Sequence, residues 1–119
     1  MSSHIRLRRA YDAPASDDGY RVLVDRLWPR GVSKKDARID EWARDLAPSD
    51  ELRRWFAHDP ERWTEFQHRY QAELHDKDDA LDHLGRRATQ GRVTLVYGAR
   101  DQQHNNAVVL RDVLERRPA

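Results

Sequence analysis

The sequence predicts a single α/β domain over residues 1–119, with a small, mostly parallel sheet of about three to four strands flanked by helices. Three observations lead to this class. Short apolar segments rich in β-branched residues alternate with segments of helical periodicity. The connection between the second and third strand segments is long and helical, as a parallel pair requires. The length fits one domain, since domains average about 150 residues.

Three segments predict strands. Residues 4–9 alternate between apolar and basic side chains, which is typical of a half-buried strand. Residues 12–19 collect Asp, Pro, Ser and Gly and predict a loop. Residues 20–27 are short, apolar and β-branched, and this second strand must stop at Pro29 because proline cannot donate to a sheet ladder. Residues 92–97 (RVTLVY) give the clearest strand pattern.

Helices are predicted where a capping residue precedes a helical pattern. One of them carries an apolar stripe at spacings of three and four residues, which we interpret as core packing rather than as a stacking platform. The predicted helices are 34–37 after Ser33, 40–46 from the cap Asp40, 50–57 after Ser49, a helix opened by Asp59 and Pro60 with the stripe Trp63, Phe66, Tyr70 and Leu74, 80–90 ended by Gly91, and a last helix from His104 onward.

Composition excludes several classes of function. The chain has no cysteine, which removes disulfides, thiolate nucleophiles and cysteine metal sites. The 22 basic and 21 acidic residues nearly cancel, so no nucleic-acid partner is expected. No apolar run is long enough for a membrane span, and the start of the chain lacks a signal-peptide pattern, so we expect a cytoplasmic protein without a membrane partner. No cofactor and no metal site are expected, because glycine fingerprints are absent and no two histidines are spaced as ligand pairs on a helix.

Polar side chains gather after the second and third predicted strands, in the segments 25–31 and 98–106. Ligands of open α/β sheets bind at the carboxyl ends of strands, beside helix N-termini. Arginine grips phosphate and carboxylate groups bidentately, so these segments predict a site for a small anion. We expect the ligand-binding residues to be Arg26, Trp28, Arg30, Arg100, Asn105 and Asn106.

His104 and Asp101 are the candidate catalytic residues. If the protein is an enzyme, one of them is expected to act as general acid or base in a hydrolase- or transferase-like step that forms no thiol intermediate. The arginines would then hold the ligand and offset developing charge. His104 could equally be a polar residue in the first turn of the last helix.

Structural interpretations of the same residues stay open. Asp25 and Arg26 could form an ion pair that fixes the end of the strand. Trp28 could lie in a buried corner, since tryptophan is mostly buried. Asn105 or Asn106 could serve as the N-cap of the last helix, because asparagine is among the preferred capping residues.

Three long stretches carry a resemblance to a known family: DGYRVLVDRLWPRGVSK at 18–34, DEWARDLAPSDELRRWFAHDPERWTEFQHRY at 40–70 and LVYGARDQQHNNAVVLRDVL at 95–114. The chain resembles the YeaO-like branch of the domain of unknown function 488 family over nearly its whole length. The resemblance implies a small α/β fold, a bacterial or archaeal source and no settled activity.

The order of strand, polar loop and helix at 93–114 is similar to the active loop of rhodaneses and cysteine phosphatases. Those enzymes place a catalytic cysteine directly after the strand, where this chain has Gly98 or Ala99. An anion cradle without a nucleophile is what this likeness implies, and it is an analogy of architecture only.

The sequence therefore predicts an arginine-lined pocket for a phosphate ester, a nucleotide or a carboxylate. The alternative is a non-enzymatic binding or protein-interaction module, in which Trp28, Trp55 and Trp63 form a partner surface. The two interpretations differ in what they predict for the arginines. A ligand pocket requires arginines without acidic partners, whereas in an interaction module the arginines pair with acidic neighbours. The oligomeric state is left open.

Overall fold

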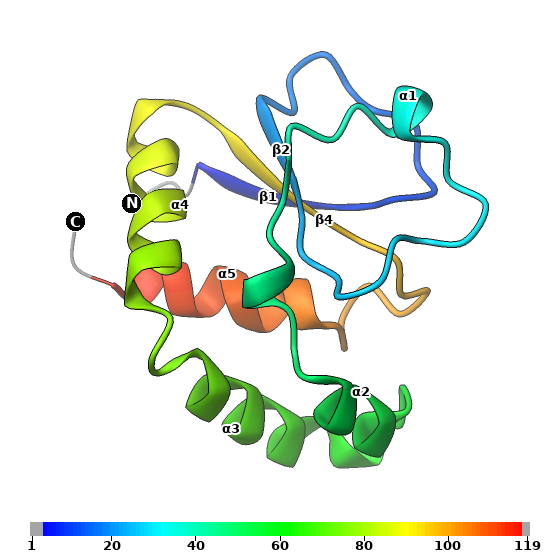
Figure 1. Cartoon of the computed structure of the whole chain (residues 1–119), viewed down its shortest axis with the longest axis vertical. Coiled ribbons are helices and arrows are strands. Elements are labelled where there is room, and N and C mark those ends of the chain that lie inside the picture. The colour runs from blue at the N-terminus through cyan, green and yellow to red at the C-terminus, as the bar shows by residue number, and fades with distance from the viewer. Residues whose placement is uncertain (1–3, 118–119) are drawn as a thin grey trace.

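The computed structural model describes residues 4–117, which include a four-stranded parallel sheet in the order β1-β4-β2-β3. Figure 1 labels its three longer strands, β1, β4 and β2. The strands β1 (Ile5–Arg9) and β2 (Tyr20–Leu23) lie on either side of β4 (Val93–Tyr97), and β3 (Glu41–Trp42) forms the far edge. The α/β class and the parallel pairing of β2 with β4 are confirmed. The carboxyl ends of these two strands therefore open onto the same edge of the sheet.

The prediction of a helix over residues 40–46 is wrong. Glu41–Trp42 pairs with β2 as a short strand, and Arg44–Leu46 forms a single 3₁₀ turn, η1. The backbone N–H of Ala43 donates to the carbonyl of Leu23 at 2.8 Å. The free edge of β2 thus binds the backbone of this segment, and that tertiary pairing overrides a local capping signal.

The other predicted helices are present, with ends that differ by a few residues. The last helix begins at Asn106 because the side chain of Asn105 caps it, accepting a hydrogen bond from the N–H of Val108 at 3.1 Å. The N-cap interpretation of Asn105 is thereby confirmed. The helical elements are α1 (Lys34–Ala37), α2 (Asp50–Phe56), the 3₁₀ turn η2 (Pro60–Arg62), α3 (Trp63–Leu74), α4 (Asp78–Gln90) and α5 (Asn106–Arg116).

The helices α2 to α5 contribute to one large core against one face of the sheet. In Figure 1, α4 and α5 lie beside the strands and α3 continues below them toward α2. The stripe predicted on α3 faces this core, since Phe66 and Tyr70 are 2% and 0% exposed and Trp63 is half-buried. The hydroxyl of Tyr70 donates to the carbonyl of Leu46, which ties α3 to η1.

Loops and the short α1 cover the opposite face of the sheet. A small cluster of Ala10, Leu23 and Val96 lies there, and the half-buried Trp28 and Trp42 pack against it. Their rings meet edge to face, with centroids 5.5 Å apart. The loop that leaves β2 therefore folds back over the sheet before the chain enters α1.

A buried ion cluster fastens the loop 10–19 to this second face. The carboxylate of Asp18 is 1% exposed and accepts hydrogen bonds from Arg21 at 2.6 Å and Arg6 at 3.1 Å. Arg21 is 3% exposed and also donates from Nε to the carbonyl of Ala37 in α1 at 3.0 Å. A buried charge is tolerated because it is paired and hydrogen-bonded.

Candidate functional site

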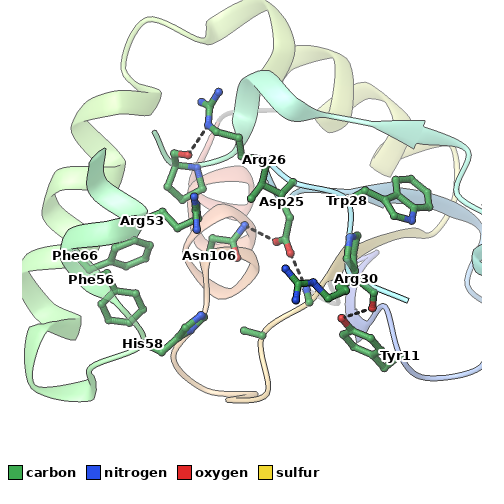
Figure 2. Close-up of a pocket in the computed structure, with 15 residues that line it drawn as sticks. Tyr11, Asp25, Arg26, Trp28, Arg30, Arg53, Phe56, His58, Phe66 and Asn106 are labelled. Atoms are coloured by element: carbon green, nitrogen blue, oxygen red, sulfur yellow. Dashed lines mark hydrogen bonds between the residues drawn. The ribbon is translucent and has the colours of Figure 1, made fainter. Parts of the chain in front are cut away.

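A cavity of about 570 Å³ opens at the carboxyl ends of β2 and β4 (Figure 2). Its size falls within the range of small-molecule sites, roughly 300–1,000 Å³. One side comes from the loop after β2 and the other from α2 and the start of α3. The floor comes from Asp25, the loop after β4 and the first residue of α5. The lining residues are Tyr11, Asp25, Arg26, Leu27, Trp28, Pro29, Arg30, Pro48, Arg53, Phe56, His58, Phe66, Gly98, Ala99 and Asn106.

Asp25 occupies the centre of the floor (Figure 2). Its Oδ2 accepts the backbone N–H of Gly98 at 2.8 Å, and its Oδ1 accepts the side-chain amide of Asn106 at 3.2 Å. The same amide donates to the carbonyl of Val24 at 2.8 Å. A Cβ at position 98 would stand 3.0 Å from Oδ2, so glycine permits this close approach. The carboxylate thereby joins the ends of two strands to the start of α5.

The pKa of Asp25 is raised above its ordinary value. Burial is the largest cause, and it outweighs the hydrogen bonds from Gly98 and Asn106 and the nearby charges of His58 and Arg53, which all favour the ionised form. The same carboxylate also acts on Tyr70 of α3, whose pKa is raised by burial and further by the charge of Asp25. Asp25 is the one carboxylate among the residues that line the cavity.

Three arginines line the cavity around this carboxylate. Arg26 donates from Nε to the carbonyl of Pro48 at 3.0 Å, and the side chain of Arg30 is exposed. Within residues 4–117 neither makes an ion pair with a carboxylate, so Asp25 and Arg26 do not form the pair that their adjacency suggested. Arg53 of α2 pairs weakly with the exposed Asp50 at 3.3 Å. The cavity thus holds guanidinium groups whose charge is only partly offset.

His58 approaches the cavity through an unusual stretch of backbone. Ala57 ends α2 with φ of 48°, and His58 follows with φ of 57°. Both are left-handed conformations that residues other than glycine rarely adopt, and each costs of order 1 kcal/mol or more. Two such residues in succession turn the chain so that the imidazole of His58 lies beside the cavity, as Figure 2 shows.

Apolar side chains form much of the remaining wall. Phe56 and Phe66 stack on each other with ring centroids 4.3 Å apart. Tyr11 and Leu27, at 49% and 54% exposure, are the large hydrophobic residues most open to solvent in the described part of the chain, and both line this cavity. The hydroxyl of Tyr11 donates to the carbonyl of Arg30 at 2.9 Å, which holds the ring at the cavity mouth.

The structure brings four of the residues expected from the sequence into this lining. The lining includes Arg26, Trp28, Arg30 and Asn106. Arg100, Asp101, His104 and Asn105 are not among its residues, although they lie in the loop between β4 and α5. Their expected roles in ligand binding or catalysis stay predictions.

Asp101 and His104 form a compact pair at the start of α5. Oδ2 of Asp101 lies 2.9 Å from Nδ1 of His104, and Oδ1 accepts the backbone N–H groups of Gln103 and His104. The N–H of Gln103 and then the imidazole of His104 hold the pKa of Asp101 below its usual value. The rings of Trp63 and His104 meet edge to face, with their centroids 5.2 Å apart. This geometry builds the turn that precedes α5.

Sequence reasoning missed two cationic residues of the site. Arg53 lies in the middle of α2, and His58 follows the end of that helix. Neither adjoins a strand end in the sequence, and the signal that predicted Arg26 and Arg30 was adjacency to a strand. They reach the cavity because α2 packs against α3 at the open edge of the sheet, which only the tertiary structure determines.

The described residues contain neither a metal-binding cluster nor a membrane-spanning helix. No three side chains of His, Asp or Glu between residues 4 and 117 gather closely enough to hold a metal ion. No helix in the same range is both long and apolar enough to cross a membrane.

Comparison with known proteins identifies relatives that match nearly end to end. The chain is 45% identical over 115 residues to the uncharacterised protein Rv3073c of Mycobacterium tuberculosis, which covers 97% of both chains. It is equally similar to the uncharacterised protein Mb3100c of Mycobacterium bovis. It is 40% identical over 111 residues to the uncharacterised protein YeaO of Escherichia coli, which covers 93% of this chain and 96% of YeaO.

No solved structure matches the chain, so the expected likeness to rhodaneses and phosphatases gains no support. A family model described as the inactive DUF488-N3 subclade matches residues 4–119. Because that match covers almost the whole sequence, the chain belongs to the DUF488 family, in the subclade described as inactive DUF488-N3.

Proposed function

We propose that the cavity at the ends of β2 and β4 binds a small anionic ligand, which is a phosphate ester, a nucleotide or a carboxylate, and that it does so without chemical turnover. The observation that carries the proposal is the pair Arg26 and Arg30. Both line the cavity, and neither is paired with a carboxylate in the described part of the chain. Each unpaired guanidinium group offers several N–H donors and a positive charge to an anion.

Two further features support an anion site. The strained backbone at His58 places an imidazole beside the arginines of the cavity, and strain of this sort concentrates at functional positions. The description of the matching subclade as inactive supports binding rather than catalysis. The same description gives no support to a catalytic role for His104 and Asp101. Their side chains pair with each other and stabilise the turn before α5.

The alternative of an interaction module has less support. Trp28 packs with the cluster on the loop-covered face, whereas Trp55 and Trp63 pack against the core on the helical face. The three tryptophans therefore do not form one partner surface. The guanidinium groups of Arg62 and Arg69 lie over the ring of Trp55, 5.4 and 4.1 Å from its centroid, and cover it.

Replacing Arg30 with alanine tests the anion site directly. Because its side chain is exposed and makes no ion pair within residues 4–117, the substitution should leave the melting temperature unchanged. Phosphate affinity should fall about 10-fold or more, since a hydrogen bond to a charged group contributes roughly 1.5–3 kcal/mol. Isothermal titration with inorganic phosphate measures the effect.

Arg54→Ala is the matched control. Arg54 is another exposed arginine of the same helix as Arg53, and it does not line the cavity. Its replacement removes the same net charge and should leave phosphate affinity within about two-fold, by salt screening of distant charges. Equal losses in both variants would mean that only overall charge attracts phosphate. Absence of saturable binding to the wild type at millimolar phosphate would refute the proposal.

The pH dependence of sulfate binding follows from Asp25. Because its pKa is raised, Asp25 gains a proton above the usual range of about pH 4 as pH falls, and one negative charge leaves the cavity. Sulfate, which keeps its charge, should therefore bind more tightly as the pH falls from about 7 toward about 4, the ordinary pKa of an aspartate. Asp25→Asn should bind well at both pH values and flatten the profile.

His58 requires a separate control in this experiment, because it also lines the cavity and carries the other titratable side chain there that can become cationic. His58→Asn removes that contribution, and asparagine tolerates the left-handed backbone. The remaining charged groups around Asp25, which are Arg26, Arg30 and Arg53, keep their charge throughout. A profile that stays steep in Asp25→Asn and flattens in His58→Asn would assign the dependence to the histidine.

A further inference from the structure

The cavity is larger than an inorganic anion requires. A phosphate group needs only the guanidinium groups, whereas the open cavity has a volume of about 570 Å³. Cavities of this size bind ligands with a substantial organic body. The chemistry of the rest of the wall therefore indicates what that body is.

Asp25 repels an anion, so a different part of the ligand must lie against it. An ionised carboxylate offers about four lone-pair positions, and the hydrogen bonds from Gly98 and Asn106 use two of them. A carboxylate oxygen with a free lone pair can accept a hydrogen bond from a ligand hydroxyl group. A carboxylate at the carboxyl end of a strand is the group that other α/β proteins use to bind ribose hydroxyls.

The apolar wall accounts for a third part of the ligand. Leu27 and Tyr11 are about half exposed, although each is a large hydrophobic side chain. Exposed apolar surface at a concave site is typical of a binding groove. Figure 2 shows Tyr11 on one side of the floor and the Phe56 and Phe66 rings on the other, with Asp25 between them. A flat ring on the Tyr11 side of Asp25 would meet the half-exposed ring of Tyr11, whereas Phe56 and Phe66 are only 5% and 2% exposed.

We infer that the ligand is a ribonucleoside monophosphate, whose phosphate lies on the arginines, whose ribose hydroxyls donate to Asp25 and whose base covers the apolar wall. The inference rests on the proposed function, because it assigns the rest of the same cavity. It adds two contact residues, Asp25 for the sugar hydroxyls and Leu27 for the face of the base. The hydroxyl of Tyr11 already donates its proton to the carbonyl of Arg30 and therefore does not donate to a base. The apolar wall thus contacts the face of a base without selecting one base over another.

The test compares ligands on the full chain by isothermal titration. AMP should bind at least 10-fold more tightly than ribose 5-phosphate, which lacks the base, and more tightly than inorganic phosphate. The 2′,3′-dideoxy analogue of AMP should lose about 10-fold relative to AMP, which tests the Asp25 contact without altering the protein. GMP, CMP and UMP should bind within about 10-fold of AMP.

Two substitutions connect these differences to residues. Leu27→Ala should weaken AMP and leave ribose 5-phosphate unchanged, and the exposure of Leu27 means that the fold is preserved. Asp25→Asn should abolish the difference between AMP and its dideoxy analogue. Lys35→Ala, which lies outside the cavity, is the control and should change none of these affinities.

Two outcomes separate this inference from the proposed function. If phosphate, ribose 5-phosphate and AMP bind with equal affinity and Arg30→Ala weakens all three, the anion site stands and the nucleotide inference is overturned. The nucleotide inference is likewise overturned if AMP and its dideoxy analogue bind equally. If none of the ligands binds, both proposals fail together.

Discussion

Phe66→Ala should lower the free energy of unfolding by about 3–5 kcal/mol, the usual cost of removing a buried aromatic ring. Phe66 is 2% exposed and packs among three other aromatic rings. Its ring centroid lies 4.3 Å from that of Phe56 and 5.7 Å from those of Trp63 and Tyr70. Its removal leaves a void that these rings cannot fill without shifting. Chemical denaturation followed by tryptophan fluorescence measures the loss.

The control for this prediction is Leu27→Ala, which removes a large apolar side chain that is 54% exposed. Its cost should stay within about 0.5 kcal/mol, as for most surface substitutions. Similar losses in the two variants would contradict the assignment of Phe66 to the core. Because Phe66 also lines the cavity, Phe66→Leu, which keeps most of the volume, is the better variant for binding studies.

Asp18→Ala should be comparably destabilising, by about 3–5 kcal/mol, because it leaves a buried arginine without its partner. Arg21 is 3% exposed, and its contact with Asp18 at 2.6 Å is its one ion pair within residues 4–117. Asp17→Ala is the matched control: Asp17 also binds Arg6, at 3.0 Å, but its side chain is 65% exposed. An exposed pair contributes at most about 1 kcal/mol.

The pH dependence of stability gives a second measurement of Asp18. Burial raises the pKa of Asp18, but the N–H of Ala15 and the guanidinium groups of Arg21 and Arg6 outweigh it and hold the pKa below the usual value. The stabilisation is therefore complete above the ordinary pKa, near 4, and is lost as pH falls through the lower value of the folded state. In Asp18→Asn this loss should be absent. An identical acid profile in wild type and variant would contradict the assignment.

The Asp18 cluster also bears on the cavity. It anchors the loop 10–19, and Tyr11 of that loop stands at the cavity mouth. A variant that frees the loop should therefore weaken binding of ligands that contact the apolar wall more than binding of phosphate alone. This coupling distinguishes a local opening of the loop from global unfolding.

The sequence was informative where one physical requirement dominates a segment. Strand β4 is buried at all five positions. A short run of apolar and β-branched residues is typical of a parallel strand that is covered on both faces. The N-cap at Asn105 and the apolar stripe of α3 could also be predicted, because local hydrogen bonding and helical periodicity act within a few residues of the chain. At the site, adjacency to strand ends identified Arg26 and Arg30, since neighbouring parallel strands end at one edge.

The tertiary structure alone decided the remainder. Glu41–Trp42 became a strand because the edge of β2 was free to pair, which no local pattern records. Arg53 and His58 joined the cavity because α2 packs at the open edge of the sheet, far along the chain from either strand end. The sequence by itself determined the α/β class and four residues of the cavity lining, Arg26, Trp28, Arg30 and Asn106. Packing between distant segments placed Arg53 and His58 in the same lining, because the energy of that packing is shared among residues whose spacing in the chain carries no signal.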